Sequence, residues 1–396
     1  MDDVIPATSL HTGTSPPRAL VYTRDENAAG IIRQTMAEMG ILDTVLKADT
    51  LSTALRDVPN SPSPRLLIID IDGDPDPVPK LRSLIDACEP STSVIVIGKD
   101  NDIRLFREIR AVGVADYFFK PLVTALLIRS CRAITGGVQE SQPNRSAKMI
   151  FVVGVRGGCG ASTLTVRTAL KLSENPPRPV LLLDLDLQFG DIALQLDATP
   201  NSALSEALAQ SERVDDLFLE RGLVKVTGHL DLMASLTYLD AATRFDETAL
   251  LSLLEKVGQR YRYVVVDVPA AHAPAFVQTL HLPGTLILVS DGRLVSAREV
   301  ARWYQWLGTK GDDRKVMHIL NKNGAHGALS VDDFTKAAGK APDVLIPFSR
   351  EVTAQALEGL KVHPDCPPLD RGLDPVIAQV AGKPSEAPWS LKRWLG

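Results

Sequence analysis

The stretch GVRGGCGAST, from Gly154 to Thr163, follows the apolar run MIFVV and decides how the second half of the chain folds. A glycine-rich turn between a buried strand and a helix lets backbone N–H groups converge on one point, beside the positive end of the helix dipole. Such a turn typically binds phosphate. The usual pattern G-x-x-x-x-G-K-[ST] is met only in part. Val155 occupies the position of the first glycine in this pattern, and Ala161 occupies the position of the lysine. Ser162 fits the position of the hydroxyl that binds Mg²⁺.

Carboxylates follow two further apolar runs. The segment LLLDLDLQFGD places Asp184 and Asp186 at the end of one run, and YVVVDVP places Asp267 at the end of another. Ligands of open α/β sheets bind beyond the carboxyl ends of the strands, so these side chains are expected to converge on the glycine-rich turn. One carboxylate there can hold the hydration shell of Mg²⁺, and another can orient a water near a γ-phosphate. Taken singly, each aspartate is equally well explained as the cap of the following helix.

The chain is predicted to be of the α/β class, with two doubly wound parallel-sheet domains. In 149–362, continuous Val, Ile and Leu runs alternate with helical segments, as in a parallel sheet covered by helices on both faces. Five shorter βα repeats fill 18–134 and predict a small receiver-like or flavodoxin-like sheet, with Pro121 at a helix start. The remaining segments are predicted to be a disordered tail (1–17), a polar linker (135–148) and a Pro-rich C-terminal tail (363–396).

The composition of the chain indicates which partners and which cellular compartment to expect. The net charge is −5 and no long Lys/Arg run occurs, so no specific nucleic-acid partner is expected. The beginning of the chain lacks the basic-then-apolar order of a signal peptide, and no apolar stretch approaches the roughly 20 residues that span a bilayer. The four cysteines form no C-x-x-C pair, which is typical of a reducing compartment. These features predict a cytoplasmic protein.

The order of turn and aspartates in 149–362 resembles the ParA/MinD family of deviant Walker-A ATPases. The resemblance implies binding of ATP and Mg²⁺, with Ser162, Asp184 and Asp267 at the metal and Asp186 at the water-orienting position. Asn321 in ILNKNG and Pro347 in LIPFS resemble the family's adenine-contacting positions, although these two matches are of low specificity. The family's loop K-G-G-x-G-K-T-T falls on eight residues that are expected to bind nucleotide: Arg156, Gly157, Gly158, Cys159, Gly160, Ala161, Ser162 and Thr163.

Both signature lysines of that family are absent. In the family the first lysine reaches across a dimer to the partner's phosphates; Arg156 keeps the charge and can grip phosphate bidentately. The second is Ala161, which has no charge. Losing one electrostatic contact in a dry site costs on the order of 10²–10³ in rate, whereas binding through backbone amides and Mg²⁺ suffers less. We therefore expect nucleotide binding with slow or negligible hydrolysis.

The segment GVADYFFKPL resembles the end of a response-regulator receiver domain, with Lys120 as its lysine and Asp70 in RLLIIDID at the phosphoacceptor position. Aspartyl phosphorylation also needs an acidic pair that binds Mg²⁺ and a hydroxyl beside the phosphoryl group. The pair is displaced to Asp25 and Glu26, and Gly98 stands at the hydroxyl position. We expect an unphosphorylated domain used for docking, in which Lys120 pairs with a carboxylate such as Asp70.

An atypical receiver fused to a ParA/MinD-like domain whose loop reads G-G-x-G-A-S resembles the TadZ/CpaE family of tight-adherence (Flp) pilus systems. The resemblance implies a cytoplasmic factor, often at a cell pole, that recruits pilus or secretion assembly proteins at the inner membrane and forms a nucleotide-dependent homodimer. Two alternatives stay open: an active ParA/MinD-type positioning ATPase, and a phosphorylation-gated signalling protein. The ending PWSLKRWLG could be a weak peripheral membrane anchor or simply a disordered or packed terminus.

Overall fold

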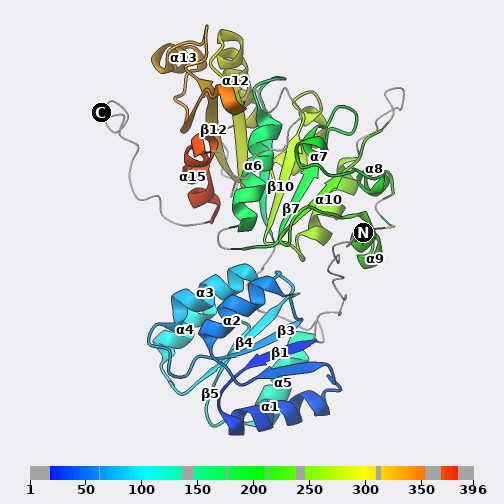
Figure 1. Ribbon diagram of the computed structural model, residues 1–396, viewed down its shortest axis with the longest axis vertical. Helices are drawn as coiled ribbons and strands as arrows, with labels where there is room; N and C mark the ends of the chain where they lie inside the picture. Colours follow the sequence, from blue (N-terminus) through cyan, green and yellow to red (C-terminus); the bar gives the residue numbers. More distant parts are fainter. Residues whose placement is uncertain are drawn as a thin grey trace, which may run out of the picture. The chain divides into compact units, whose positions relative to one another are not determined.

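The computed structural model describes residues 18–61, 63–135, 147–174, 177–210, 212, 214–237, 246–308, 314–352 and 367–381. The chain divides into two compact units, Met1–Asn144 and Arg145–Gly396. Figure 1 labels their helices and strands. The predicted tail 1–17, most of the predicted linker and the apolar–basic ending lie outside the described residues.

The first unit is a five-stranded parallel sheet in the order β2-β1-β3-β4-β5, a flavodoxin-like arrangement. Its strands are β1 (Ala19–Tyr22), β2 (Thr44–Lys47), β3 (Leu66–Asp70), β4 (Ser93–Gly98) and β5 (Asp116–Phe119). Its helices are α1 (Glu26–Glu38), α2 (Leu51–Asp57), α3 (Pro77–Ala87), α4 (Ile103–Ala111) and α5 (Thr124–Thr135). Alternate residues of β3 bury toward opposite faces, so that Leu67 and Ile68 belong to different cores. This period of two, with both faces apolar, explains why the strand reads as one continuous hydrophobic run.

The second unit is built on an eight-stranded sheet in the order β13-β12-β11-β6-β10-β7-β9-β8. Every pairing in it is parallel except that of β8 with β9. Its strands are β6 (Lys148–Gly154), β7 (Val180–Asp184), β8 (Val224–Lys225), β9 (Leu230–Ala234), β10 (Tyr263–Val268), β11 (Gly284–Asp291), β12 (Arg314–Asn323) and β13 (Val344–Pro347). The central position of β6 places the turn that follows it in the middle of the carboxyl edge.

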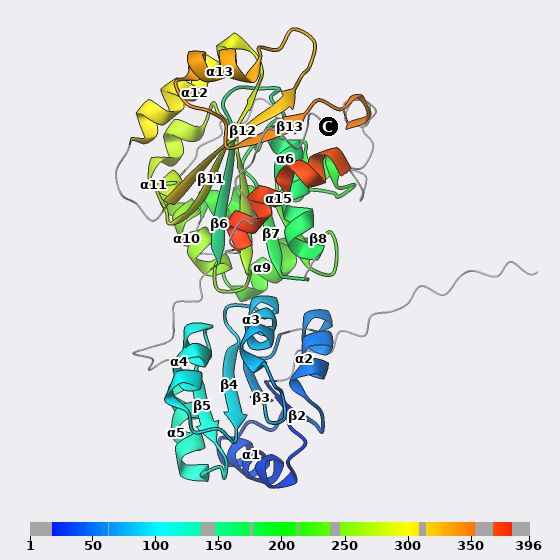
Figure 2. The same ribbon diagram turned by 90° about the vertical axis from the view of Figure 1, so that its left-hand side faces the viewer.

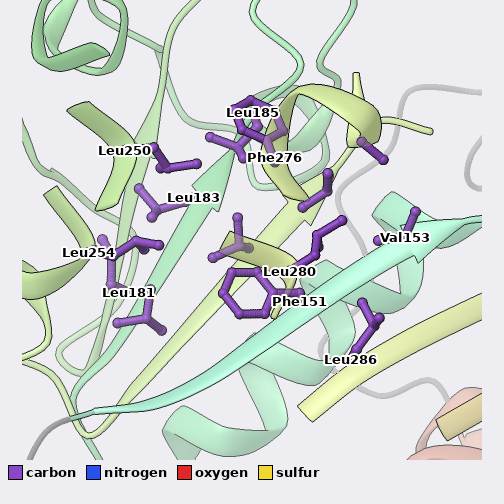
Figure 3. Packing of buried hydrophobic residues seen from close by; sticks show 14 of the residues in the cluster. Phe151, Val153, Leu181, Leu183, Leu185, Leu250, Leu254, Phe276, Leu280 and Leu286 are labelled. Atoms are coloured by element: carbon purple, nitrogen blue, oxygen red, sulfur yellow. The ribbon is translucent and has the colours of Figure 1, made fainter. Parts of the chain in front are cut away.

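Helices cover both faces of this sheet (Figure 2). They are α6 (Ala161–Glu174), α7 (Ile192–Gln195), α8 (Ala203–Ala209), α9 (Asp216–Gly222), α10 (Glu247–Val257), α11 (Val277–Leu280), α12 (Leu294–Leu307), α13 (Val331–Ala338) and α15 (Pro367–Ala381). Phe151 and Val153 of β6 point into one core, part of which Figure 3 shows, and Ile150 and Val152 point into the other. The two doubly wound parallel sheets confirm the predicted fold class.

Three details differ from the sequence-based expectations. Residues 367–381, predicted to be part of a tail, form α15, which lies against α6 and β13 (Figure 2). The carboxylate of Asp370 on α15 accepts two hydrogen bonds from the buried Arg167 of α6, one from Nε at 2.6 Å and one from Nη2 at 2.7 Å. Strands β8 and β9 were not anticipated, because β8 has only two residues and the short run LDLMA of β9 is interrupted by an aspartate. Finally, Pro121 follows a cis peptide bond and lies three residues before α5 begins, not at its start.

Candidate nucleotide-binding site

Five parallel strands of the second unit end at one edge of the sheet and bring the predicted residues together. The chain leaves β6 at Gly154, turns, and enters α6 at Ala161. Gly158 and Gly160 have φ angles of +77° and +92°, in the region that side chains avoid. A Cβ atom on Gly160 would lie 2.5 Å from Nδ2 of Asn321. The turn therefore needs glycine, both for its curvature and for the close approach of β12.

Three side chains of the turn are buried in the cores or pack against them. Val155 and Cys159 are buried in the cores on opposite faces of the sheet. Burial also raises the pKa of the Cys159 thiol, so that it stays protonated. Ala161, at the position of the usual lysine, packs its methyl group against one of these cores, and Thr163 lies in the first turn of α6. Phosphate binding at the turn stays a prediction; it would rest on backbone N–H groups and the start of a 14-residue helix.

A hydroxyl–carboxylate cluster lies where α6 meets the end of β10. Ser162 donates from Oγ to Oδ2 of Asp267 at 2.8 Å, and Thr165 donates from Oγ1 to Oδ1 of the same carboxylate at 2.8 Å. Thr165 was missed from the sequence, although its spacing of three from Ser162 places both on one helix face. A serine hydroxyl touching a carboxylate beside a glycine-rich turn fits the ligand set of Mg²⁺.

Asp184 and Asp267 occupy paired positions on the neighbouring strands β7 and β10, and both are buried. Burial, followed by the nearby charge of Asp267, raises the pKa of Asp184 to about 8. Burial also raises the pKa of Asp267 to about 6, against the hydrogen bonds from Ser162 and Thr165, which lower it. Because burial disfavours the charge of both carboxylates and Asp267 opposes the ionisation of Asp184, a divalent cation would stabilise their charged forms. Among the described residues no three His, Cys, Asp or Glu side chains form a metal cage, so a cation here would also use water or phosphate oxygens.

Asp186 caps the turn that follows β7. Its Oδ1 accepts the N–H of Phe189 at 2.9 Å and that of Gln188 at 3.4 Å. This is the capping role that any single strand-terminal aspartate can take. Its water-orienting role stays a prediction.

Arg156 is bound within its own chain. Its Nε donates to Oγ of Ser296 at 2.8 Å, and its Nη2 is paired with Asp291 at the end of β11. Ser296, at the start of α12, donates in turn to Asp291. Sequence reasoning missed both partners, because they lie some 140 residues away and join no recognisable motif. In this arrangement a neighbouring carboxylate already balances the charge of Arg156.

The end of β12 closes the other side of the turn. Asn321 is buried and donates from Nδ2 to the carbonyl oxygen of Cys159 at 2.9 Å. Lys322 donates from Nζ to the carbonyl oxygen of Gly158 at 2.8 Å. Pro347 lies in register with Asn323, at the end of β13. Asn321 therefore braces the turn, and the adenine contacts at Asn321 and Pro347 stay predictions.

In the first unit, Lys120 is ion-paired with the carboxylates expected to form the receiver site. Its Nζ lies 2.7 Å from Asp70, 3.1 Å from Asp25 and 3.4 Å from Asp72. Thr23 also donates to Oδ2 of Asp70 at 2.6 Å. Burial disfavours the charge on Lys120, but hydrogen bonds to Asp70 and Asp25 outweigh burial and raise the pKa of the ammonium. The lysine occupies the place between carboxylates that a cation would need.

Gly98 shows why the hydroxyl of a receiver is missing. A Cβ atom at this position would lie 2.9 Å from the hydroxyl of Tyr117 and 3.1 Å from Cγ1 of Ile71. Tyr117 holds that position because its hydroxyl donates to the carbonyl oxygen of Asp100 at 2.7 Å. Tyr117 thus fills the space in which a serine or threonine would stand.

Residues 147–307 match the family described as AAA domain. The second unit has the fold of the ParA/MinD P-loop ATPases. A crystal structure of a ParA family ATPase from Chlorobium tepidum superposes with a TM-score of 0.52 at 24% identity, over 60% of this chain and 98% of that one. This likeness concerns the fold of the second unit.

The relatives found by sequence match only about a third of this chain. A ParA family protein of Chlamydia trachomatis is 28% identical over 131 residues, which is 31% of this chain. The chain spans about half the length of the curated relatives it matches. A pilus assembly protein CpaE from Caulobacter crescentus is 31% identical over 30% of this chain and 95% of that one, with a TM-score of 0.28. In the described part of this chain, no helix combines the length and apolarity needed to cross a membrane.

Proposed function

We propose that this chain is a nucleotide-binding assembly factor of a Flp-type pilus or a related type II/IV-like secretion machine, with weak or absent ATPase activity. The observation that carries the proposal is that the site keeps some residues of a nucleotide-binding site and lacks another. The glycine-rich turn, Ser162 and the carboxylates of Asp184 and Asp267 are kept, while the cation at position 161 is lost. The link to pilus assembly rests on the combination of an atypical receiver with a G-G-x-G-A-S loop.

Binding of MgATP or MgADP is supported by what the site retains. Backbone N–H groups at a helix start stabilise phosphate without any side chain. Mg²⁺ would join the Ser162 hydroxyl and the Asp267 carboxylate, now 2.8 Å apart, to the phosphates and would relieve the protonation of Asp184. Asn321 holds the turn in place from β12.

Weak hydrolysis is supported by what the site lacks. Ala161 cannot stabilise charge that develops on the phosphates, and losing one such contact costs on the order of 10²–10³ in rate. Arg156 could replace it only by leaving Asp291 and Ser296. Asp186 is occupied with capping its own turn.

Nucleotide would then act as a structural ligand. A ligand that binds one arrangement of a homodimer better than the separate chains stabilises that dimer by mass action, and no turnover is needed. The first unit would supply a second docking surface that does not switch, because Lys120 already pairs with Asp70, Asp25 and Asp72. Recruitment of pilus assembly proteins at the inner membrane, often at a pole, would follow from these two surfaces.

Three measurements on the full chain test the proposal. Titration calorimetry should give a Kd for MgATP or MgADP below about 1 mM, and S162A should weaken it at least tenfold. Sedimentation velocity should show more dimer with MgATP than without. Turnover should stay well below about 1 s⁻¹, with or without lipid vesicles or DNA. Absence of binding would overturn the proposal, and turnover of about 1 s⁻¹ stimulated by lipid or DNA would instead support the positioning ATPase.

A further inference from the structure

Lys322 is a cation that reaches the glycine-rich turn from outside the motif. Lys322 follows Asn321 at the end of β12. The side chain of Asn321 holds the backbone of Lys322, because Oδ1 of Asn321 accepts the N–H of Lys322 at 2.9 Å. From there the aliphatic part of Lys322 passes beside the turn, with Cε 3.7 Å from where a Cβ on Gly160 would be. Its ammonium ends on the carbonyl oxygen of Gly158, at 2.8 Å.

The backbone at this position supports the reach of the side chain. Lys322 has a φ of 56°, which residues other than glycine rarely adopt. The register between β12 and β13 shifts between Leu320 and Asn323 at the same place. Such an irregularity redirects a side chain that an ordinary strand would point elsewhere. Here the redirected side chain is a lysine, and it lies on the turn.

The charges around the turn leave Lys322 as the cation available for a ligand. Ala161 contributes none, and the guanidinium of Arg156 is paired with Asp291. Lys322 has no acidic partner within the described residues, and its ammonium donates to a neutral carbonyl oxygen. An ammonium has three N–H donors, so two remain for other acceptors. Its flexible four-carbon stem can also follow a phosphate that enters the turn.

We propose that Lys322 is a phosphate-binding residue that supplies, from the end of β12, the positive charge missing at position 161 for nucleotide binding, though not for hydrolysis. This inference rests on the proposed nucleotide site and adds the residue that makes it electrostatically favourable. The ligand class is a nucleoside di- or triphosphate, since the ammonium lies at the turn that cradles the phosphates. The P-loop lysine is thereby replaced by one from another strand, without being restored in the motif.

Calorimetric titration of the full chain with MgADP, and separately with adenosine, tests the assignment. K322Q should weaken MgADP binding about tenfold to a hundredfold, which is the range for hydrogen bonds to charged groups. Adenosine binding should change by less than about twofold, because it carries no phosphate. K322R, which keeps the charge, should stay within about fivefold of the unchanged chain. K315Q is the matched control, because Lys315 is an exposed lysine at the opposite end of the same strand, and it should have no effect.

A double substitution tests replacement of the missing charge directly. In an A161K background, K322Q should lose less than about threefold in MgADP affinity, since two cations would serve the same phosphates and their effects would not add. An equal loss in both backgrounds would overturn the claim that Lys322 replaces position 161.

The remaining outcomes separate this inference from the function on which it rests. If the unchanged chain binds MgADP and K322Q binds it equally well, Lys322 is not a phosphate ligand and the proposed function stands. If K322Q weakens adenosine as much as MgADP, Lys322 only shapes the pocket and the inference fails. If the unchanged chain binds neither nucleotide, the proposed function fails first.

Discussion

Replacing Asp184 by asparagine should stabilise the nucleotide-free protein, by an amount that grows with pH. Burial and the neighbouring Asp267 raise the pKa of Asp184 from its ordinary value of 3.8 to about 8. The folded state therefore holds a proton that the unfolded chain releases. Because the unfolded state binds fewer protons between about pH 4 and pH 8, the free energy of unfolding falls as pH rises through this window. The neutral amide of D184N removes that dependence.

The size of the effect follows from the shift. Each pKa unit corresponds to about 1.4 kcal/mol, so the cost of keeping Asp184 protonated is about 2 kcal/mol at pH 5 and about 4 kcal/mol at pH 7. Asp184 is only 3% exposed, so solvent screening does not reduce these values much. Relative to the unchanged protein, D184N should gain about 2–3 kcal/mol between pH 5 and pH 7. Asp267 is present in both proteins, so its own contribution largely cancels.

Tryptophan fluorescence during urea unfolding is the appropriate assay. All four tryptophans (Trp303, Trp306, Trp389 and Trp394) lie in Arg145–Gly396, so their emission reports on the second unit alone. The exposed Asp332 of α13 provides the control D332N, expected to change stability by less than about 0.5 kcal/mol at either pH. A D184N stabilisation that is the same at pH 5 and pH 7 would refute the assignment of a raised pKa. A further signature is that MgADP should stabilise the unchanged protein and have little effect on D184N.

Three other outcomes are expected. G160A should weaken MgADP binding at least tenfold by calorimetry, because a methyl group there needs φ of +92° and meets Asn321 at 2.5 Å. D370A should destabilise the second unit by about 3–5 kcal/mol in the fluorescence assay, because it removes the carboxylate that holds the buried Arg167. Acetyl phosphate should leave no adduct on Asp70 in intact-mass measurements; a stable phosphoryl adduct would contradict the view that Lys120 blocks this site.

Local patterns in the sequence were enough to predict the fold and the backbone of the site. Strands with both faces buried appear as continuous apolar runs, so β6, β7 and β10 could be found without tertiary information. Parallel strands end at a common edge, which is why Asp184 and Asp267 could be expected beside the turn. Short or irregular elements were not predicted, notably β9, whose five residues carry an aspartate at the second position.

Side-chain pairing across long distances could not be predicted. Asp291 holds Arg156 from 135 residues away, and nothing in its local sequence marks it as a partner. Lys322 depends on a left-handed residue and a register shift, which arise from how β12 meets β13 and not from local propensity. Likewise α15 contains Pro375 and follows a Pro-rich segment, so its composition suggested a tail; its contacts with α6 override that local signal.

The two acidic sites of the chain differ in how their charge is balanced, and this difference supports assigning them different roles. In the first unit Lys120, with only 9% of its side chain exposed, is an internal cation held among three carboxylates. Nothing there depends on a ligand, so the unit should keep one state. In the second unit Asp184 and Asp267 have no such internal cation within the described residues, and burial raises the pKa of both. Because the carboxylates of such a site must either take up protons or bind a cation, the charge state of the site changes when a cationic ligand binds. Under the proposed function, regulation by MgATP would therefore act through the second unit, and constitutive docking through the first.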